Sequence, residues 1–110
     1  RGYGTNARVL SKYVREKNII SLEEAIRRMT SLSAQKFQLK HIGLLKEGMD
    51  ANIVVFNENE VGDKSTYEKP HQYSTGFKYV LVNGKLTLRN GQHTGERNGK
   101  ALYGPTYRQP

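Results

Sequence analysis

The chain contains no cysteine, and hydrophobic residues make up only 35% of its 110 residues. The absence of cysteine excludes a disulfide framework and thiolate chemistry, and it leaves the redox compartment undetermined. No run of about 18 apolar residues occurs, which excludes a membrane-spanning helix. The mean hydropathy is −0.75. With so few apolar residues in one small domain, an independent and well-filled core is not expected.

The chain begins at Arg1 rather than at Met, so we expect that further residues precede it in a longer polypeptide. Residues 1–10 lack the apolar stretch of a secretory signal peptide. Because the start is truncated, this absence gives no address for the parent protein; a cytoplasmic parent is our expectation, with a periplasmic or secreted parent left open.

The net charge of +8 at first favours a nucleic-acid partner. Its distribution argues against one. Residues 1–46 hold ten Lys/Arg against three Glu, whereas residues 47–110 are nearly balanced. The basic residues of the first half are scattered, and Arg27-Arg28 is their only adjacent pair. Solvated helix faces are the simpler interpretation, and a phosphate-binding surface is the alternative.

Residues 1–40 are expected to be helical. Apolar residues at three- and four-residue spacing predict a first helix over residues 6–16. Ser21 and Glu24 then form the pattern of a capping box, in which each side chain bonds to the other residue's backbone amide. The helix that starts there should end at Thr30-Ser31. A short third helix should run to about Leu39, with its apolar residues Ala34 and Phe37 facing inward.

Residues 41–95 change to the period of strands. A short strand is expected from Gly43 into a glycine turn at Gly48. The run from Ile53 to Phe56 suits a strand that is covered on both faces. Two further strands, over residues 77–82 and 85–89, should form a hairpin, because Asn83-Gly84 between them suits a type I′ turn. A second turn is expected after them, at Asn90-Gly91.

Two segments show no regular pattern. The loop over residues 57–76 is long for a compact domain, so it either packs on something outside this chain or is mobile. The tail over residues 96–110 is polar and is expected to be flexible. The chain is thus divided into a helical segment (1–40), a sheet segment with a long loop (41–95) and a tail.

Three groups of residues, in this order, carry a resemblance to a known family. They are 1–10 (RGYGTNARVL), 29–34 (MTSLSA) with 43–56 (GLLKEGMDANIVVF), and 70–73 (PHQY) with 79–84 (YVLVNG) and 91–95 (GQHTG). The middle group resembles the amidohydrolase superfamily at large. The flanking groups resemble specifically the D-aminoacylases, which are N-acyl-D-amino-acid deacylases. Ser33 and Asn52 depart from the Pro and Asp usual in that family, at positions that carry no chemistry there, and Asn6 stands where the family usually has an aromatic residue.

The resemblance implies an α+β fragment of a larger fold. Its helices would be the last outer helices of a TIM barrel, and its antiparallel strands would belong to the composite β-sandwich beside that barrel. The parent enzyme would use zinc to hydrolyse the amide bond of N-acyl-D-amino acids. Because such enzymes hold their metal at the C-terminal ends of barrel strands, the catalytic residues and metal ligands would precede Arg1, and this fragment would bind no metal and be inactive alone.

Only Arg1 is a candidate site residue. The resemblance assigns it to the substrate's carboxylate, which a guanidinium group matches with two parallel N–H donors. His41, His71 and His93 lie about 20 to 30 residues apart, without the spacing of a ligand set. The expected partners are the remainder of the parent chain, the N-acyl-D-amino acid substrate and, for the isolated fragment, a second copy; no nucleic acid or membrane is expected.

Two alternatives remain open at this stage. One is another amidohydrolase-superfamily enzyme that acts on cyclic amides or ureas. The other is a small basic nucleic-acid-binding module, whose affinity would fall with salt concentration.

Overall fold

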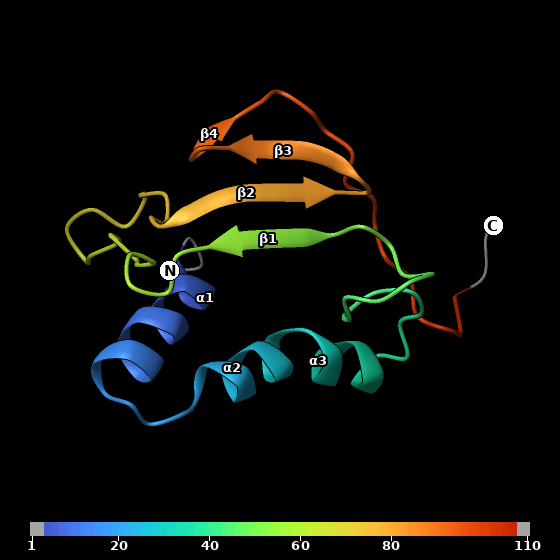
Figure 1. Cartoon of the computed structure of the whole chain (residues 1–110), viewed down its shortest axis with the longest axis horizontal. Helices are drawn as coiled ribbons and strands as arrows, with labels where there is room; N and C mark the ends of the chain where they lie inside the picture. The colour runs from blue at the N-terminus through green and yellow to red at the C-terminus, as the bar shows by residue number, and fades with distance from the viewer. Residues whose placement is uncertain (1–3, 108–110) are drawn as a thin grey trace.

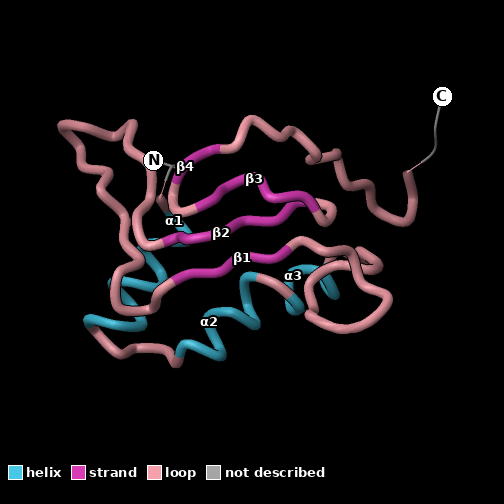
Figure 2. Tube along the Cα trace, turned by 45° about the horizontal axis from the view of Figure 1, so that its top comes forward, coloured by secondary structure: helices cyan, strands magenta, loops and turns pink. Residues whose placement is uncertain are grey.

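The computed structural model describes residues 4–107. Helical elements come first and a four-stranded antiparallel sheet follows (Figure 1). The α+β order predicted from the sequence is therefore confirmed. Both views place the helices along one side of the sheet, with β1 as the strand nearest to them (Figures 1 and 2).

The first helix changes its winding along its length. α1 spans Thr5–Arg8 and continues directly into η1, a π-helix over Val9–Glu16. This matches the helix predicted over residues 6–16, but the π winding was not predicted. The amide of Lys17 accordingly donates to the carbonyl five residues back at 2.9 Å. Asn18 ends the helix with a φ of 52°, a left-handed conformation that asparagine tolerates better than most residues.

The second helix, α2 (Leu22–Met29), starts at the predicted cap. Ser21 Oγ accepts a hydrogen bond from the Glu24 amide at 3.1 Å. The capping box also predicted a reciprocal hydrogen bond from the Ser21 amide to the Glu24 carboxylate, and that prediction is wrong. Glu24 turns its carboxylate to Arg27 at 2.6 Å and to Arg28 at 3.1 Å instead. Bonds from two cationic donors are stronger than a bond from one neutral amide, which accounts for the choice.

The third helix, α3 (Ser31–Lys36), is shorter than predicted. Ala34 is buried as expected, but Phe37 is 64% exposed and the helix does not reach Leu39. The chain leaves the helical path because Gln38 adopts a φ of 54°. The side chain of Phe37 therefore lies at the helix end on the surface of the chain.

The segment that follows α3 forms bends and turns, so the strand predicted between Gly43 and Gly48 is wrong. Gly43 adopts a φ of 92°. A Cβ at that position would lie 2.8 Å from the Cβ of Ala34 and 3.2 Å from the carbonyl oxygen of Thr30. Glycine is thus required by a close approach to α3 as well as by the backbone angle.

The sheet has the order β1-β2-β3-β4, with every neighbouring pair antiparallel. Its strands are β1 (Ile53–Phe56), β2 (Phe77–Val82), β3 (Lys85–Arg89) and β4 (Gln92–His93). The predicted β2–β3 hairpin is confirmed, with φ of 51° at Asn83 and 80° at Gly84. The second predicted turn is confirmed by the same angles at Asn90-Gly91, 48° and 81°.

β1 is an edge strand, and its surroundings differ from the prediction. The sequence predicted a strand covered on both faces, but Val54 is 50% exposed and Val55 is 45% exposed. That prediction is wrong for the described part of this chain. Such apolar residues are typical of a strand that another layer of protein covers.

The loop over residues 57–76 supplies the most buried side chain of the small core. Val61 has no exposed surface, and it lies in a cluster with Ala7, Leu10 and Ala25. Phe56 and Phe77, at the two ends of the loop, pack against this cluster. The base of the loop therefore packs on the helices of this chain, which neither of the two sequence-based alternatives anticipated.

The molecule exposes more surface than a self-contained domain of its size. Its accessible surface is 8758 Å², whereas a compact monomer of this mass exposes about 6,200 Å². Its radius of gyration is 15.2 Å, compared with about 13 Å for a compact domain of this length. The excess of about 2,600 Å² is comparable with the area that a large permanent interface buries.

Candidate functional site

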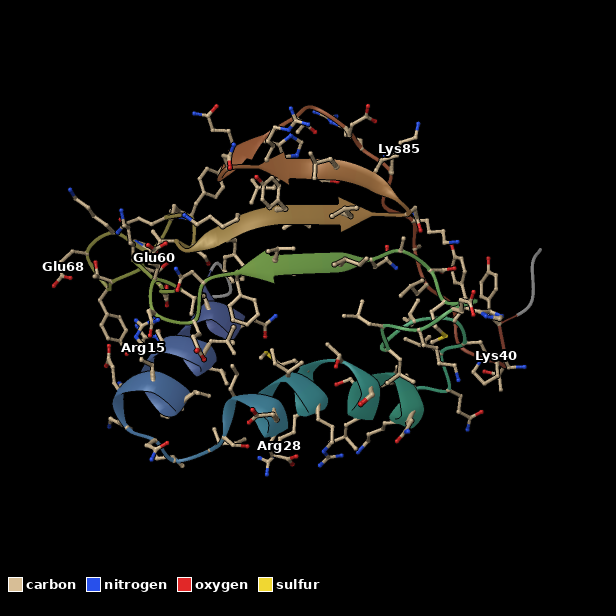
Figure 3. The ribbon with its side chains drawn as sticks, viewed as in Figure 1. Arg15, Arg28, Lys40, Glu60, Glu68 and Lys85 are labelled. Carbon is tan, nitrogen blue, oxygen red and sulfur yellow. The ribbon has the colours of Figure 1, made fainter. Side chains whose placement is uncertain are left out.

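A groove of about 690 Å³ separates the helices from the sheet. One wall consists of α2, α3 and the segment after α3, and the other wall is β1. Figure 3 shows the side chains of the two walls facing each other across this region. The apolar residues that line it include Ile26, Met29, Phe37, Leu39, Leu44 and Val54.

The groove combines an apolar wall with an open strand edge. Within the described residues β1 has a neighbour only on the β2 side, so alternate backbone groups on its other side point away from the sheet. The side chains of Phe37, Leu44 and Val54 are 64%, 52% and 50% exposed. An extended segment placed here could pair with the edge of β1 and bury side chains against the helices. The groove therefore combines apolar side chains with backbone groups that have no strand neighbour among the described residues.

A second feature lies at the other end of the molecule, where the 57–76 loop meets the first helix. Arg15 donates one guanidinium nitrogen to two backbone carbonyls of the loop, that of Glu58 at 2.9 Å and that of Val61 at 2.8 Å. Figure 3 shows Arg15 beside the loop that carries Glu60, while Glu68 extends at the far end of the loop. The loop is thus fixed at its base and projects beyond it.

Arg8 makes a second contact between the first helix and the loop, an ion pair with Asp63. Its Nε lies 3.1 Å from Asp63 Oδ2, and Asp63 Oδ1 accepts from the amide of Ser65 at 2.8 Å. The carboxylate side chain is only 8% exposed. The hydrogen bond from the Ser65 amide, with the contribution of Arg8, holds the pKa of Asp63 below its usual range. Asp63 is therefore charged, and its bonds to Arg8 and Ser65 make it an anchor between the loop and the first helix.

The three histidines singled out from the sequence lie on separate segments. Arg1, the candidate for the substrate carboxylate, lies outside the described residues 4–107. His41 follows α3, His71 lies in the 57–76 loop and His93 lies on β4. Among residues 4–107, no three His, Cys, Asp or Glu side chains form a group that could hold a metal ion.

No helix in the described part of the chain is long and apolar enough to cross a membrane.

Comparison with known proteins shows the family to which this chain belongs. A profile of the Amidohydrolase family matches residues 3–88. The chain belongs to the amidohydrolase family. It is 42% identical to an N-acyl-D-aspartate deacylase of Alcaligenes xylosoxydans xylosoxydans over 93% of its length. It is also 43% identical over 76% of its length to an N-acyl-D-glutamate deacylase of the same organism, and 37% identical over 93% of its length to a D-aminoacylase.

Solved structures agree with this family segment in fold as well as in sequence. The chain superposes on a crystal structure of D-aminoacylase with a TM-score of 0.86 and 37% identity, over 90% of this chain. It superposes on an N-acyl-D-glutamate deacylase from Bordetella bronchiseptica, in complex with zinc and a phosphonate inhibitor, with a TM-score of 0.80 and 39% identity, over 87% of this chain. The predicted resemblance to D-aminoacylases is confirmed.

The amidohydrolase segment is short compared with its relatives. It spans about a fifth of their length, 20% of the N-acyl-D-aspartate deacylase and 21% of the D-aminoacylase structure. The small core, the large exposed surface and the groove are the features expected of such a part. Sequence reasoning missed the groove and the Asp63 anchor, because both depend on contacts between residues far apart in the chain.

Proposed function

We propose that this chain is the C-terminal part of a larger deacylase that hydrolyses the amide bond of N-acyl-D-amino acids. The observation that carries the proposal is its 42% identity over 93% of the chain to a deacylase of which it spans only 20%. The other two relatives named above also act, by their names, on N-acyl-D-amino acids. Cyclic-amide or urea hydrolysis and nucleic-acid binding have no comparable support.

Within that enzyme, residues 1–40 would provide the last outer helices of the barrel. Residues 41–95 would provide part of the small β-sandwich and residues 96–110 a tail, of which 108–110 lie outside the described residues. Arg1 would bind the substrate's carboxylate through paired N–H donors. The chain's own role is structural, apart from that one residue.

The described residues do not fit a zinc site, because they hold no group of three metal-binding side chains. We therefore assign the metal ligands and the catalytic residues to the remainder of the larger enzyme. Two of the related structures are a zinc complex and a D-aminoacylase studied for its binuclear metal centre. The proposed function accordingly includes zinc as the cofactor of the whole enzyme.

The groove beside β1 is the proposed contact surface for the remainder of the enzyme. A strand paired to the open edge of β1 would satisfy outward-pointing backbone groups, and its side chains would cover Phe37 and Val54. In the isolated chain the same edge is available to a second copy. We therefore expect the isolated chain to self-associate, and to be a dimer or larger by light scattering at crystallisation concentrations.

An exchange of segments tests the proposed function. In the N-acyl-D-aspartate deacylase, the region that matches this chain is replaced by this chain. The hybrid should hydrolyse an N-acyl-D-amino acid, and Arg1→Ala in the hybrid should raise KM. The isolated chain should bind no stoichiometric zinc and show no turnover. A soluble, zinc-loaded hybrid without activity would refute the proposal, and so would turnover by the isolated chain.

A further inference from the structure

Asparagine is followed by glycine at three places in the chain: Asn83-Gly84, Asn90-Gly91 and Asn98-Gly99. In such a pair the backbone nitrogen of the glycine can attack the side-chain amide carbon of the asparagine, because glycine has no Cβ to obstruct the approach. The N–Cγ bond forms and the Cγ–Nδ2 bond breaks, so ammonia leaves with the glycine amide proton and a cyclic succinimide remains. Water then opens the ring at either carbonyl and gives aspartate or isoaspartate.

The pair in the β2–β3 hairpin is held against this reaction. The Gly84 amide, whose nitrogen would be the nucleophile, donates a hydrogen bond to the Ala51 carbonyl at 2.9 Å. The leaving nitrogen, Asn83 Nδ2, donates to the carbonyl oxygen of Asn98. Positive φ angles at both turn residues fix the backbone between them. Ring closure at Asn83 therefore requires the turn to open and two hydrogen bonds to break.

The pair that follows β3 is held less tightly. The Gly91 amide donates to the Lys78 carbonyl over a longer distance of 3.3 Å. Asn90 and Gly91 have the same left-handed φ angles as the hairpin pair. One turn and one long hydrogen bond thus oppose ring closure at Asn90.

The third pair lies in the tail, outside the helices and strands. The Gly99 amide donates no hydrogen bond to any residue in the described part of the chain. A Cβ at position 99 would meet no atom within 4 Å, so the surroundings of the nucleophile are open. Asn98 Nδ2 donates a long bond of 3.4 Å to Glu96 Oε2. The Gly99 nitrogen and the Asn98 amide carbon can therefore meet without any change in the sheet.

Asn98 also ties the tail to the hairpin, since its main-chain carbonyl accepts the hydrogen bond from Asn83 Nδ2. Conversion of the Asn98 amide to an acid removes the donor to Glu96 and places two carboxylates side by side, where like charges repel. In isoaspartate the main chain runs through Cβ, so the carbonyl that Asn83 holds leaves the main chain. Both changes weaken the tie between the tail and the hairpin.

We propose that Asn98 is a modification site, at which spontaneous conversion to aspartate or isoaspartate releases residues 98–107 from the hairpin. The proposal is independent of the proposed function, because it rests on contacts within this chain. A hydrogen bond of ordinary net strength changes an opening equilibrium about fivefold. With two such bonds to break at the hairpin, Asn98 should react about tenfold faster than Asn83, or more. The rate at Asn90 should lie between them.

The test follows each pair by mass spectrometry while the chain is kept at mildly alkaline pH. Trypsin releases residues 79–85 with Asn83 and residues 90–97 with Asn90, and a glutamyl endopeptidase releases residues 97–110 with Asn98. In the folded chain the amide-to-acid conversion should be fastest at Asn98 and slowest at Asn83. In denaturant the three rates should converge, because the protecting hydrogen bonds are lost. Equal rates in the folded chain, or a ratio that persists in denaturant, would overturn the proposal.

Gly99→Ala tests the chemistry at the nucleophile. The added Cβ meets no atom of the fold, and it should slow conversion at Asn98 about tenfold by obstructing ring closure. Gly104→Ala, another exposed tail position where a Cβ meets no atom within 4 Å, is the matched control and should leave the rate unchanged. Equal rates at Asn98 in both variants would exclude the succinimide route.

The release of the tail is tested on the modified chain itself, separated from the unmodified chain by its added negative charge. NMR hydrogen exchange of the Asn83 side-chain amide should be about fivefold faster after modification, because the bond to Asn98 is lost. Asn90→Asp carries the same added charge without touching the tie, and it should exchange as the unmodified chain does. Unchanged exchange in the modified chain, or equal acceleration in Asn90→Asp, would refute the release.

Discussion

Replacing Val61 by alanine should destabilise the chain more than the same change at a half-exposed valine. Val61 is completely buried between the loop and the first helix. Val→Ala removes the equivalent of two methylene groups, which costs about 1.6 kcal/mol at about 0.8 kcal/mol each. The cavity left in a small core raises the total to about 2–3 kcal/mol. For a chain of this size, that loss lowers Tm by about 10 °C or more.

The assay is denaturant and thermal unfolding followed by circular dichroism, with Val55→Ala as the control. Val55 is 45% exposed, so its replacement should cost less than about 1 kcal/mol. Equal losses in the two variants would refute the packing of the loop base on the helices. They would also remove the support for Asp63 as an anchor, because both residues belong to the same loop base.

Three other predictions concern α2 and the groove. The Arg27 hydrogen bond, followed by that of Arg28, lowers the pKa of Glu24 from 4.5 to about 2. Its contribution to stability is therefore complete above pH 4.5 and is lost as the pH falls towards 2. An NMR titration of the Glu24 carboxyl checks this, and a midpoint near 4.5 would contradict it. Ser21→Ala should cost about 1 kcal/mol in chemical unfolding, through the lost bond to the Glu24 amide; an unchanged midpoint would show that the cap contributes nothing. Val54→Lys should reduce self-association in light scattering by placing a charge in the groove, whereas Lys85→Arg, outside the groove, should not; equal association of both variants would exclude the groove as the contact surface.

Local signals allowed the elements to be predicted from the sequence. Asn83-Gly84 specified the hairpin because few residues adopt two successive positive φ angles. Ser21 specified the start of α2 because its hydroxyl satisfies a free amide. Each of these signals depends on a few neighbouring residues, so it can be recognised in the sequence without knowledge of the fold.

Features that depend on distant contacts could not be predicted in this way. Apolar spacing alone predicted that Phe37 faces inward, but the helix ends before it and the side chain lines a groove. Val61 stands in a polar loop without periodicity, and only the fold shows it to be the most buried side chain. Gly4 and Asp63 each look ordinary in sequence, and their contact depends on the packing of the loop against α1.

Assembly in trans tests most directly whether this chain is a part of a larger deacylase. The N-acyl-D-aspartate deacylase lacking the region that matches this chain is coexpressed with this chain, and with its own missing region as a positive control. The expected result is that the two polypeptides copurify and recover hydrolysis of an N-acyl-D-amino acid. Recovery with the enzyme's own region, but neither copurification nor activity with this chain, would contradict the proposed function.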